Sequence, residues 1–104
     1  MIHPSLKSAL PVVFELFKKY KIKTAYFFGS VLTDHFTQKS DLDILVNFNE
    51  DITDIFEKAR MLESLQFAIE DNIHRKVDLL EESTLKKPFF IKELNETKQL
   101  VYES

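Results

Sequence analysis

Hydrophobic positions follow a helical period in three parts of the chain. Apolar residues recur at spacings of three and four over residues 8–20 and 53–71, and again after Pro88. Either Thr53 or Asp51 is expected near the N-cap of the second helix. These stripes should pack against a sheet, and they include four aromatic side chains that we expect in the core, namely Phe14, Phe17, Phe56 and Phe67.

Three shorter runs between the helices have the character of strands. Residues 24–28 are almost continuously apolar, residues 41–48 alternate, and residues 76–80 are mostly apolar. A fourth run, 98–102, is a candidate edge strand. The first two strands are joined too briefly for a helical crossover, so the sheet should be of mixed direction. The pattern therefore predicts a single α/β (α+β) domain over residues 1–104, with a small mixed sheet and helices mainly on one face.

Composition restricts the function classes. The chain has 104 residues, a net charge of -3 and no cysteine. A weakly acidic chain gives no basis for general nucleic-acid binding, which needs a basic surface. The lack of cysteine removes disulfides and thiolate metal sites. No secretion signal is present and no apolar run reaches the ~20 residues of a membrane span, so we expect a cytoplasmic protein without membrane association.

Two aspartates open the second predicted strand. Asp41 and Asp43 are two residues apart, so a strand places both side chains on one face, with β-carbons roughly 6.5–7 Å apart. Like charges at this separation repel each other, and divalent cations bound between them would relieve the repulsion. Alone, the tripeptide is a weak signal, because both acids can simply point into solvent.

A third acid, Asp78, interrupts the apolar run of the third predicted strand. A structural strand favours a β-branched or aromatic residue at such a position, and a charge there needs a partner. One interpretation pairs Asp78 with Lys76 or Arg75 of the same segment. If the third strand instead lies beside the second, Asp78 joins Asp41 and Asp43 in a three-carboxylate metal site.

A glycine and a serine end the first predicted strand. Gly29 is the only glycine in the sequence, and a glycine at a strand end lets the backbone approach a ligand closely. N–H groups at the start of a following helical turn attract anions, and the Ser30 hydroxyl can donate to a phosphate oxygen. The alternative is an ordinary turn in which Ser30 is only an N-cap. Combined with the three acids, the Gly-Ser corner indicates metal-assisted phosphoryl chemistry.

The chain resembles the minimal nucleotidyltransferases of the DNA polymerase β-like superfamily in its Gly29-Ser30 corner, in SDLDILV and in RKVDLL. The resemblance covers about residues 10–103. It implies the nucleotidyltransferase fold and transfer of a nucleoside monophosphate, with AMP from ATP as the expected case and pyrophosphate leaving. By the same resemblance, the acceptor is a hydroxyl of a HEPN-domain toxin, and the chain is the antitoxin.

The resemblance also implies roles for individual residues. Gly29 and Ser30 would hold the triphosphate. Asp41 and Asp43 would bind two Mg²⁺ ions, and Asp78 would bind the catalytic ion and take the proton from the acceptor hydroxyl.

The sequence departs from this family just after the Gly-Ser corner. Many members have a basic residue and a second glycine there, whereas the segment SVLTDHF has neither, and Lys39 is the nearest candidate cation for the phosphates. Lys39 can equally be a solvated turn residue. The departure supports a second hypothesis, a catalytically weakened module that neutralises a HEPN partner by docking. A homo- or hetero-oligomer fits both hypotheses, since the chain has no room for an acceptor-binding domain.

Two smaller features concern the surface. The histidines His3, His35 and His74 are not at metal-ligand spacing and are expected at the surface. Phe89 and Phe90 are adjacent in a predicted helix, so both cannot easily point inward, and one of them should be exposed at a partner surface.

Overall fold

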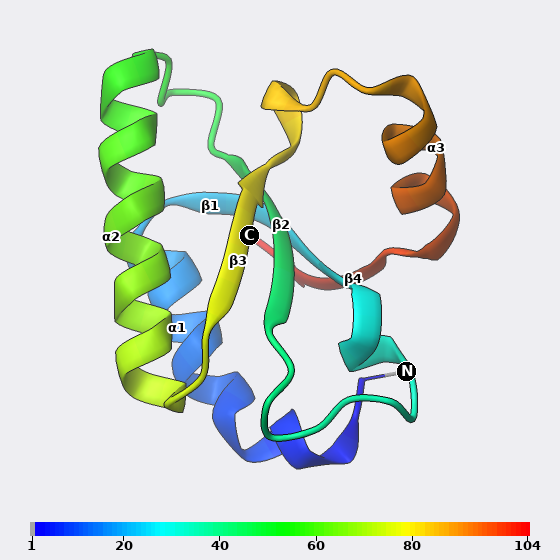
Figure 1. Cartoon of the computed structure of the whole chain (residues 1–104). Coiled ribbons are helices and arrows are strands. Elements are labelled where there is room, and N and C mark those ends of the chain that lie inside the picture. The colour runs from blue at the N-terminus through cyan, green and yellow to red at the C-terminus, as the bar shows by residue number, and fades with distance from the viewer. Residues whose placement is uncertain (1) are drawn as a thin grey trace.

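The computed structural model describes residues 2–104 and contains a four-stranded sheet in the order β3-β2-β1-β4 (Figure 1). Strand β1 (Ile22–Phe28) pairs antiparallel with β2 (Leu42–Phe48) and with β4 (Gln99–Glu103). Strand β2 pairs parallel with β3 (Val77–Glu81). The predicted mixed sheet is therefore confirmed, including the edge strand near the C-terminus.

The strands are connected by helices whose bounds lie close to the predicted ones. The described α-helices are α1 (Leu10–Lys19), α2 (Ile55–Ile73) and α3 (Pro88–Thr97), and the 3₁₀ segments are η1 (Pro4–Ala9), η2 (Gly29–Leu32) and η3 (Glu82–Thr84). The N-cap of α2 is Asp54, rather than Thr53 or Asp51, and its carboxylate accepts a hydrogen bond of 2.9 Å from the backbone N–H of Phe56. Within residues 2–104, no helix is both long enough and apolar enough to cross a membrane.

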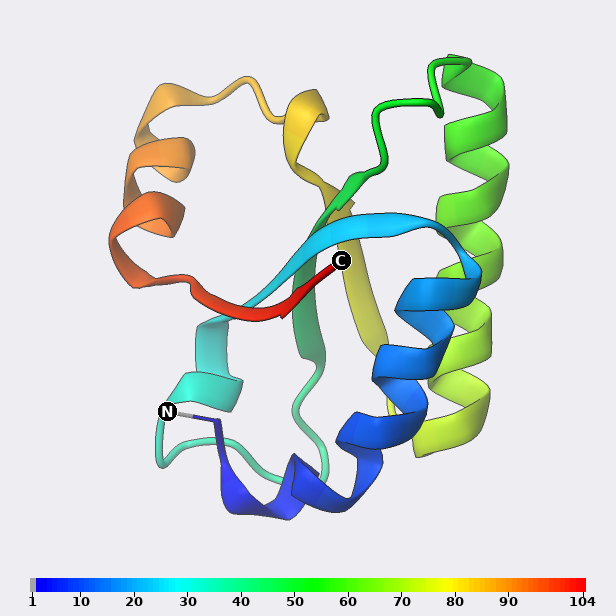
Figure 2. The same cartoon turned by 180° about the vertical axis from the view of Figure 1, so that it is seen from behind.

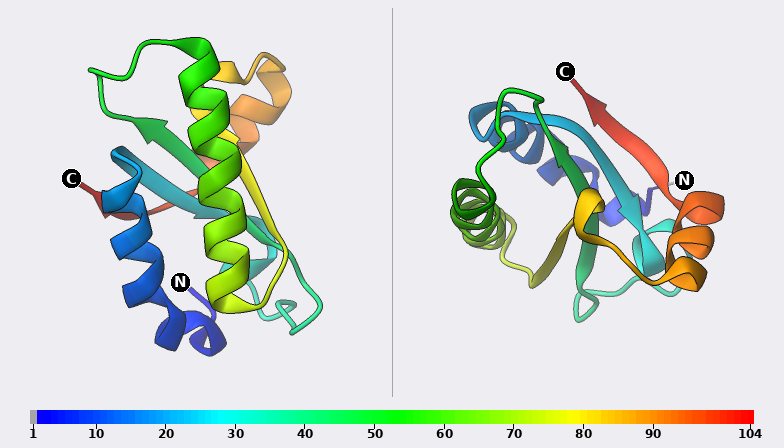
Figure 3. Two further views of the ribbon diagram at one scale, coloured as in Figure 1. Left: turned by 90° about the vertical axis from the view of Figure 1, so that its left-hand side faces the viewer. Right: turned by 90° about the horizontal axis from the view of Figure 1, so that it is seen from above.

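The two faces of the sheet are covered unequally. Helices α1 and α2 lie side by side on one face of the sheet, as Figures 1 and 2 show from opposite sides of the molecule. Helix α3 lies on the other face (Figure 3). Leu42, Ile44 and Val46 point into the larger core under α1 and α2. Leu45 points the opposite way and packs with Leu94 of α3. The predicted alternation of β2 is confirmed, as are helices mainly on one face, with α3 as the exception.

The outer side of α2 differs from the prediction. Leu65 and Ile69 are fully buried, but Phe56 is 75% exposed and Phe67 is 55% exposed. Phe56 and Phe67 are eleven residues apart, which is about three helical turns, so they share a side of the helix. That side faces away from the sheet. The expectation that these two aromatic residues lie in the core is therefore wrong, whereas the two on α1 do pack in the core.

Candidate active site

The end of β1 and the beginnings of β2 and β3 lie at the same end of the sheet, in the lower half of Figure 1. Asp43 lies opposite Phe28 of β1 and opposite Asp78 of β3. Residues directly opposite each other on paired strands place their side chains on the same face. Asp43 and Asp78 therefore share the face that carries α3. Asp41 lies one residue before β2, at the same end. The structure thus places the three predicted acids at the same end of the sheet.

Asp43 is the most strongly affected of these acids. It is half-buried, whereas Asp41 and Asp78 are exposed. Burial, followed by the negative charges of Asp78 and Asp41, raises the pKa of Asp43 from 3.8 to about 6. The dependence on both neighbours means that the three carboxylates share one electrostatic environment.

No cation pairs with the three acids in the described part of the chain. The ion pairs of residues 2–104 involve only other carboxylates. Arg75 does not pair with Asp78, because its Nη1 donates to the backbone carbonyls of Thr37 and Ser40, at 2.6 Å and 2.7 Å. Lys76 is exposed and makes no described ion pair. The interpretation of Asp78 as an internally paired acid is therefore wrong.

The Gly-Ser corner lies directly against this acidic site. Gly29 has a φ of +76°, and a β-carbon added to it would collide with the Oδ2 atom of Asp43 and lie 3.4 Å from its Cγ. Both the left-handed backbone and the close approach require glycine. Ser30 is not an N-cap, since η2 already begins at Gly29. The carbonyl of Ser30 accepts hydrogen bonds from the N–H and the hydroxyl of Thr33, at 2.9 Å and 2.8 Å.

The departure from the family pattern has a structural reason. Val31, which follows Ser30, is fully buried in the larger core, so a basic side chain does not fit at that position. Lys39 lies on the connection between η2 and β2 and is exposed. Its backbone N–H donates to the Thr37 hydroxyl at 3.2 Å, and its ammonium group has no partner in the described part of the chain. The structure therefore leaves its side chain free two residues before Asp41.

A cavity of about 550 Å³ adjoins the corner, between η2 and α3. Its size is within the range of small-molecule sites. The sequence predicted helix α3 but not that it lines this cavity, because the period of the apolar residues does not say which helix covers a site. Phe90 lines the cavity, whereas Phe89 is 80% exposed, which confirms that only one of the pair points inward. The cavity is lined by Phe28, Gly29, Leu32, Thr33, Phe90, Glu93, Leu94, Thr97 and Gln99.

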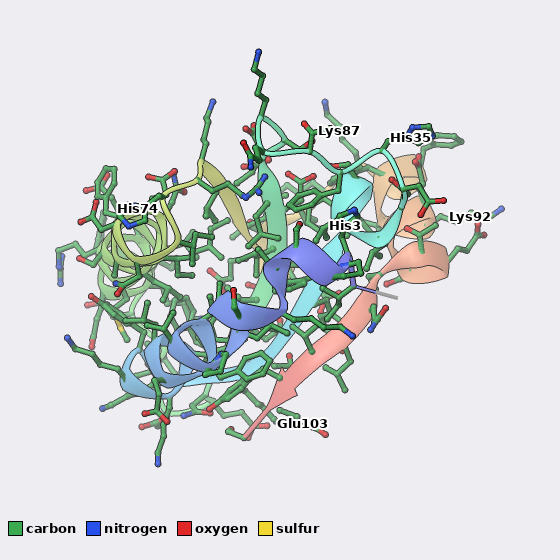
Figure 4. The ribbon with its side chains drawn as sticks, turned by 90° about the horizontal axis from the view of Figure 1, so that it is seen from below. His3, His35, His74, Lys87, Lys92 and Glu103 are labelled. Atoms are coloured by element: carbon green, nitrogen blue, oxygen red, sulfur yellow. The ribbon has the colours of Figure 1, made fainter. Side chains whose placement is uncertain are left out.

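The chemistry of the acids fits a hard divalent cation, because carboxylate oxygens are the ligands that Mg²⁺ prefers. Among residues 2–104, no three acidic or histidine side chains converge closely enough to chelate an ion in the conformation described. The three histidines do not form one cluster, since Figure 4 shows His74 well apart from His3 and His35.

Comparisons with known proteins show what the chain is similar to. A family model described as "Polymerase beta, Nucleotidyltransferase" matches residues 13–104. A protein of Methanocaldococcus jannaschii named "Putative protein adenylyltransferase" is 37% identical over 87 residues, which are 82% of this chain and 80% of the relative. A second protein of that description from the same organism is 33% identical over 88 residues, which are 85% of this chain and 83% of the relative.

Solved structures show the same fold. A structure described as a "putative minimal nucleotidyltransferase" has a TM-score of 0.71 at 26% identity and covers 95% of both chains. A complex of a tri-AMPylated Shewanella oneidensis HEPN toxin with an MNT antitoxin gives a TM-score of 0.62 at 17% identity, over 94% of this chain and 72% of that chain. A toxin–antitoxin structure with AMP-PNP gives 0.65 at 17% identity, over 94% and 73%. The last two establish likeness of fold alone.

Proposed function

Because this chain belongs to the polymerase β-type nucleotidyltransferase family, we propose that it transfers AMP from ATP to a hydroxyl group of a HEPN-domain partner in a Mg²⁺-dependent reaction. The observation that carries the proposal is the environment of Asp43. This residue is half-buried, lies opposite Asp78 and against Gly29, and has no described cation as a partner. The names of the relatives support a protein acceptor. The toxin–antitoxin complexes among the structural neighbours support the partner class.

The three acids are the proposed metal ligands. Asp41 and Asp43 would hold both Mg²⁺ ions, and Asp78 would hold the catalytic one. Bound Mg²⁺ would neutralise phosphate charge and stabilise the entering and leaving oxygens of an in-line displacement. The raised pKa of Asp43 supports this role, because ionisation is unfavourable in the metal-free protein and a divalent cation would offset that cost.

The Gly-Ser corner is the proposed triphosphate site. Gly29 has no side chain, so the backbone of the corner stays open to a phosphate beside Asp43, and the Ser30 hydroxyl donates to a phosphate oxygen. Lys39 supplies positive charge from the neighbouring connection. The cavity between η2 and α3 adjoins the corner and is large enough to take part in nucleotide binding.

The reaction then follows from position and charge. The acceptor oxygen forms a bond to the α-phosphorus, the bond from that phosphorus to its bridging oxygen breaks, and pyrophosphate leaves with the electron pair. Asp78 accepts the proton of the acceptor hydroxyl. This residue is exposed on β3, an edge strand of the sheet, so a hydroxyl on a large partner can reach it. Positioning and charge stabilisation supply most of the catalysis.

A second candidate function is a partner-binding module with weakened catalysis. The observation that favours it is the burial of Val31, which places an apolar core residue where many family members carry a cation. Without that cation the triphosphate would bind less tightly, and the HEPN partner would be neutralised by docking alone.

The two functions are separated by a transfer assay. The chain is incubated with Mg²⁺, a HEPN-domain protein encoded beside its gene, and ATP labelled at either the α- or the γ-phosphate. We expect the α label alone to appear on the partner, and Asp43→Asn to lower transfer about 1000-fold. Asp71→Asn, which changes an exposed acid of α2, is the matched control. Absence of transfer, with neutralisation that survives Asp41→Ala and Asp43→Ala, would establish the docking module instead.

A further inference from the structure

Arg75 joins two segments of the chain that carry the proposed ligands. Its Nη1 donates to the carbonyl oxygens of Thr37 and Ser40, at 2.6 Å and 2.7 Å. Its guanidinium carbon lies 4.3 Å from the centroid of the Phe36 ring, in the geometry of a cation–π contact. All three contacted residues belong to the connection that leads into Asp41. Arg75 itself precedes β3 and is half-buried.

The contacts of Arg75 extend the pairing of β2 and β3 beyond the strands. The last backbone bond at this end runs from the N–H of Leu42 to the carbonyl of Lys76, at 3.0 Å. Asp41 lies outside β2, so strand pairing no longer holds its backbone. The bond from Arg75 to Ser40 restrains the residue just before it. Among residues 2–104, this side chain is therefore the link between the backbone ahead of Asp41 and the segment entering β3.

The described contacts of Arg75 are made to the connection ahead of Asp41 and not to the acids. Both described hydrogen bonds of the guanidinium go to backbone carbonyls. A planar group that gives two N–H bonds while stacking on a ring restricts the loop in a way that a simple point charge does not.

We propose that Arg75 is a positioning residue, which holds the backbone ahead of Asp41 so that this ligand stays beside Asp43 and Asp78 and the three carboxylates can bind a divalent cation together. This inference rests on the proposed function, since it concerns the ligands of the same site. Residues that orient metal ligands from outside typically change metal affinity by about 10- to 100-fold when they are replaced.

Two variants separate position from charge. Arg75→Met keeps an apolar stem over Phe36 and removes both hydrogen bonds. Arg75→Lys keeps the charge, but its ammonium is about one bond short of the carbonyls. Lys76→Met is the matched control, because it removes the same charge from the exposed neighbouring position. The readouts are Mn²⁺ affinity, measured by electron paramagnetic resonance without nucleotide, and amide hydrogen exchange of residues 37–42.

We expect both Arg75 variants to bind Mn²⁺ about tenfold more weakly, with faster exchange of the 37–42 amides, while Lys76→Met retains wild-type affinity. Wild-type affinity in Arg75→Met would overturn the inference, and so would full recovery in Arg75→Lys, which would assign the effect to charge. If Arg75→Met fails to fold, Arg75→Lys alone decides between these outcomes. A wild-type chain that binds no Mn²⁺ would overturn the proposed function itself.

Discussion

The acidic side chains at the two ends of the paired strands β2 and β3 differ in whether a lysine pairs with them. At the carboxyl end, Glu81 and Glu82 each face a lysine. The Nζ of Lys58 lies 3.4 Å from Oε2 of Glu81, and the Nζ of Lys98 lies 2.7 Å from Oε2 of Glu82. At the amino end, the three aspartates have no such partner among residues 2–104.

The pKa shifts follow this difference. Burial opposes ionisation of Glu82, but hydrogen bonds from Lys98 and Asn47, together with the charge of Lys98, outweigh it and hold the pKa of Glu82 below its ordinary value. At Asp43, burial and the neighbouring acids act in the same direction and raise the pKa to about 6. Where an acid serves structure, the fold supplies a cation, and where acids are left unpaired, a cation from outside is expected.

The largest expected effect on stability is that of Gly29→Ala, which disturbs the amino end alone. The new β-carbon collides with the Asp43 carboxylate, and the residue must also keep a φ of +76°. We expect a loss of about 2 kcal/mol in the free energy of unfolding. AMP transfer should fall about 100-fold, because displacement of a ligand by about 1 Å costs that much. Urea unfolding and the transfer assay measure the two effects.

Ser30→Ala is the control for this prediction, because it removes a hydroxyl without adding an atom. It should leave the free energy of unfolding unchanged and lower transfer about tenfold through the lost phosphate hydrogen bond. If Gly29→Ala were as stable and active as the wild type, the close contact of the corner with Asp43 would have no role.

Lys58→Met should weaken the carboxyl end without affecting the chemistry. It leaves Glu81, which is 7% exposed, without its cation. We expect the free energy of unfolding to fall by about 1–2 kcal/mol at neutral pH, since a buried acid then lacks its charge partner. AMP transfer, assayed well below the unfolding temperature, should be unchanged. Recovery of stability in the double variant with Glu81→Gln would confirm the cause, and a parallel loss of transfer would show that the two ends are coupled.

The strands were predictable because their signal is local. The alternation of β2 predicted which side chains reach each core, and burial agrees with it at Leu42, Ile44 and Leu45. The outer side of α2 was not predictable. A helical period defines a stripe, but it does not say how far along the helix the sheet extends or how wide the buried face is. Phe56 therefore matched the pattern and is nevertheless exposed.

The candidate site was predictable in part, because the spacing of residues along a strand determines which side chains share a face. Asp43 and Asp78 are opposite each other because β2 and β3 are parallel neighbours, a pairing that the sequence alone left open. The role of Arg75 could not be predicted in this way, because its bond to Thr37 joins residues 38 positions apart and depends on the shape of a loop without periodicity. Sequence proximity instead suggested a pair with Asp78 that does not form.

Asp43→Asn should stabilise the metal-free protein at neutral pH. The pKa of this acid is raised from 3.8 to about 6 in the fold, so the folded state binds a proton more readily than the unfolded chain. The contribution of Asp43 to wild-type stability should therefore fall as pH rises from about 4 to about 6 and stay low above that range. The variant should unfold a few degrees above the wild type at pH 7.5 and at the same temperature near pH 4.

Thermal unfolding in a chelator, and then in saturating Mg²⁺, measures this prediction. Added Mg²⁺ should reverse the order at pH 7.5, because the wild type gains binding energy that the variant lacks. An Asp43→Asn protein that is less stable than the wild type in chelator would mean that an undescribed interaction stabilises the ionised carboxylate.

Lys39→Ala is expected to have the smallest effect. Its ammonium is exposed and has no described partner, so it can attract the triphosphate but is not held at the reacting phosphorus. We expect the KM for ATP to rise a few-fold with kcat unchanged, and the difference to shrink at high salt, where exposed charges are screened. Lys18→Ala on α1 is the control, because it removes an equally exposed lysine from the other end of β1. A fall in kcat that persists at high salt would instead place Lys39 against the transition state, and the connection from η2 to β2 would then have to close over the nucleotide during the reaction.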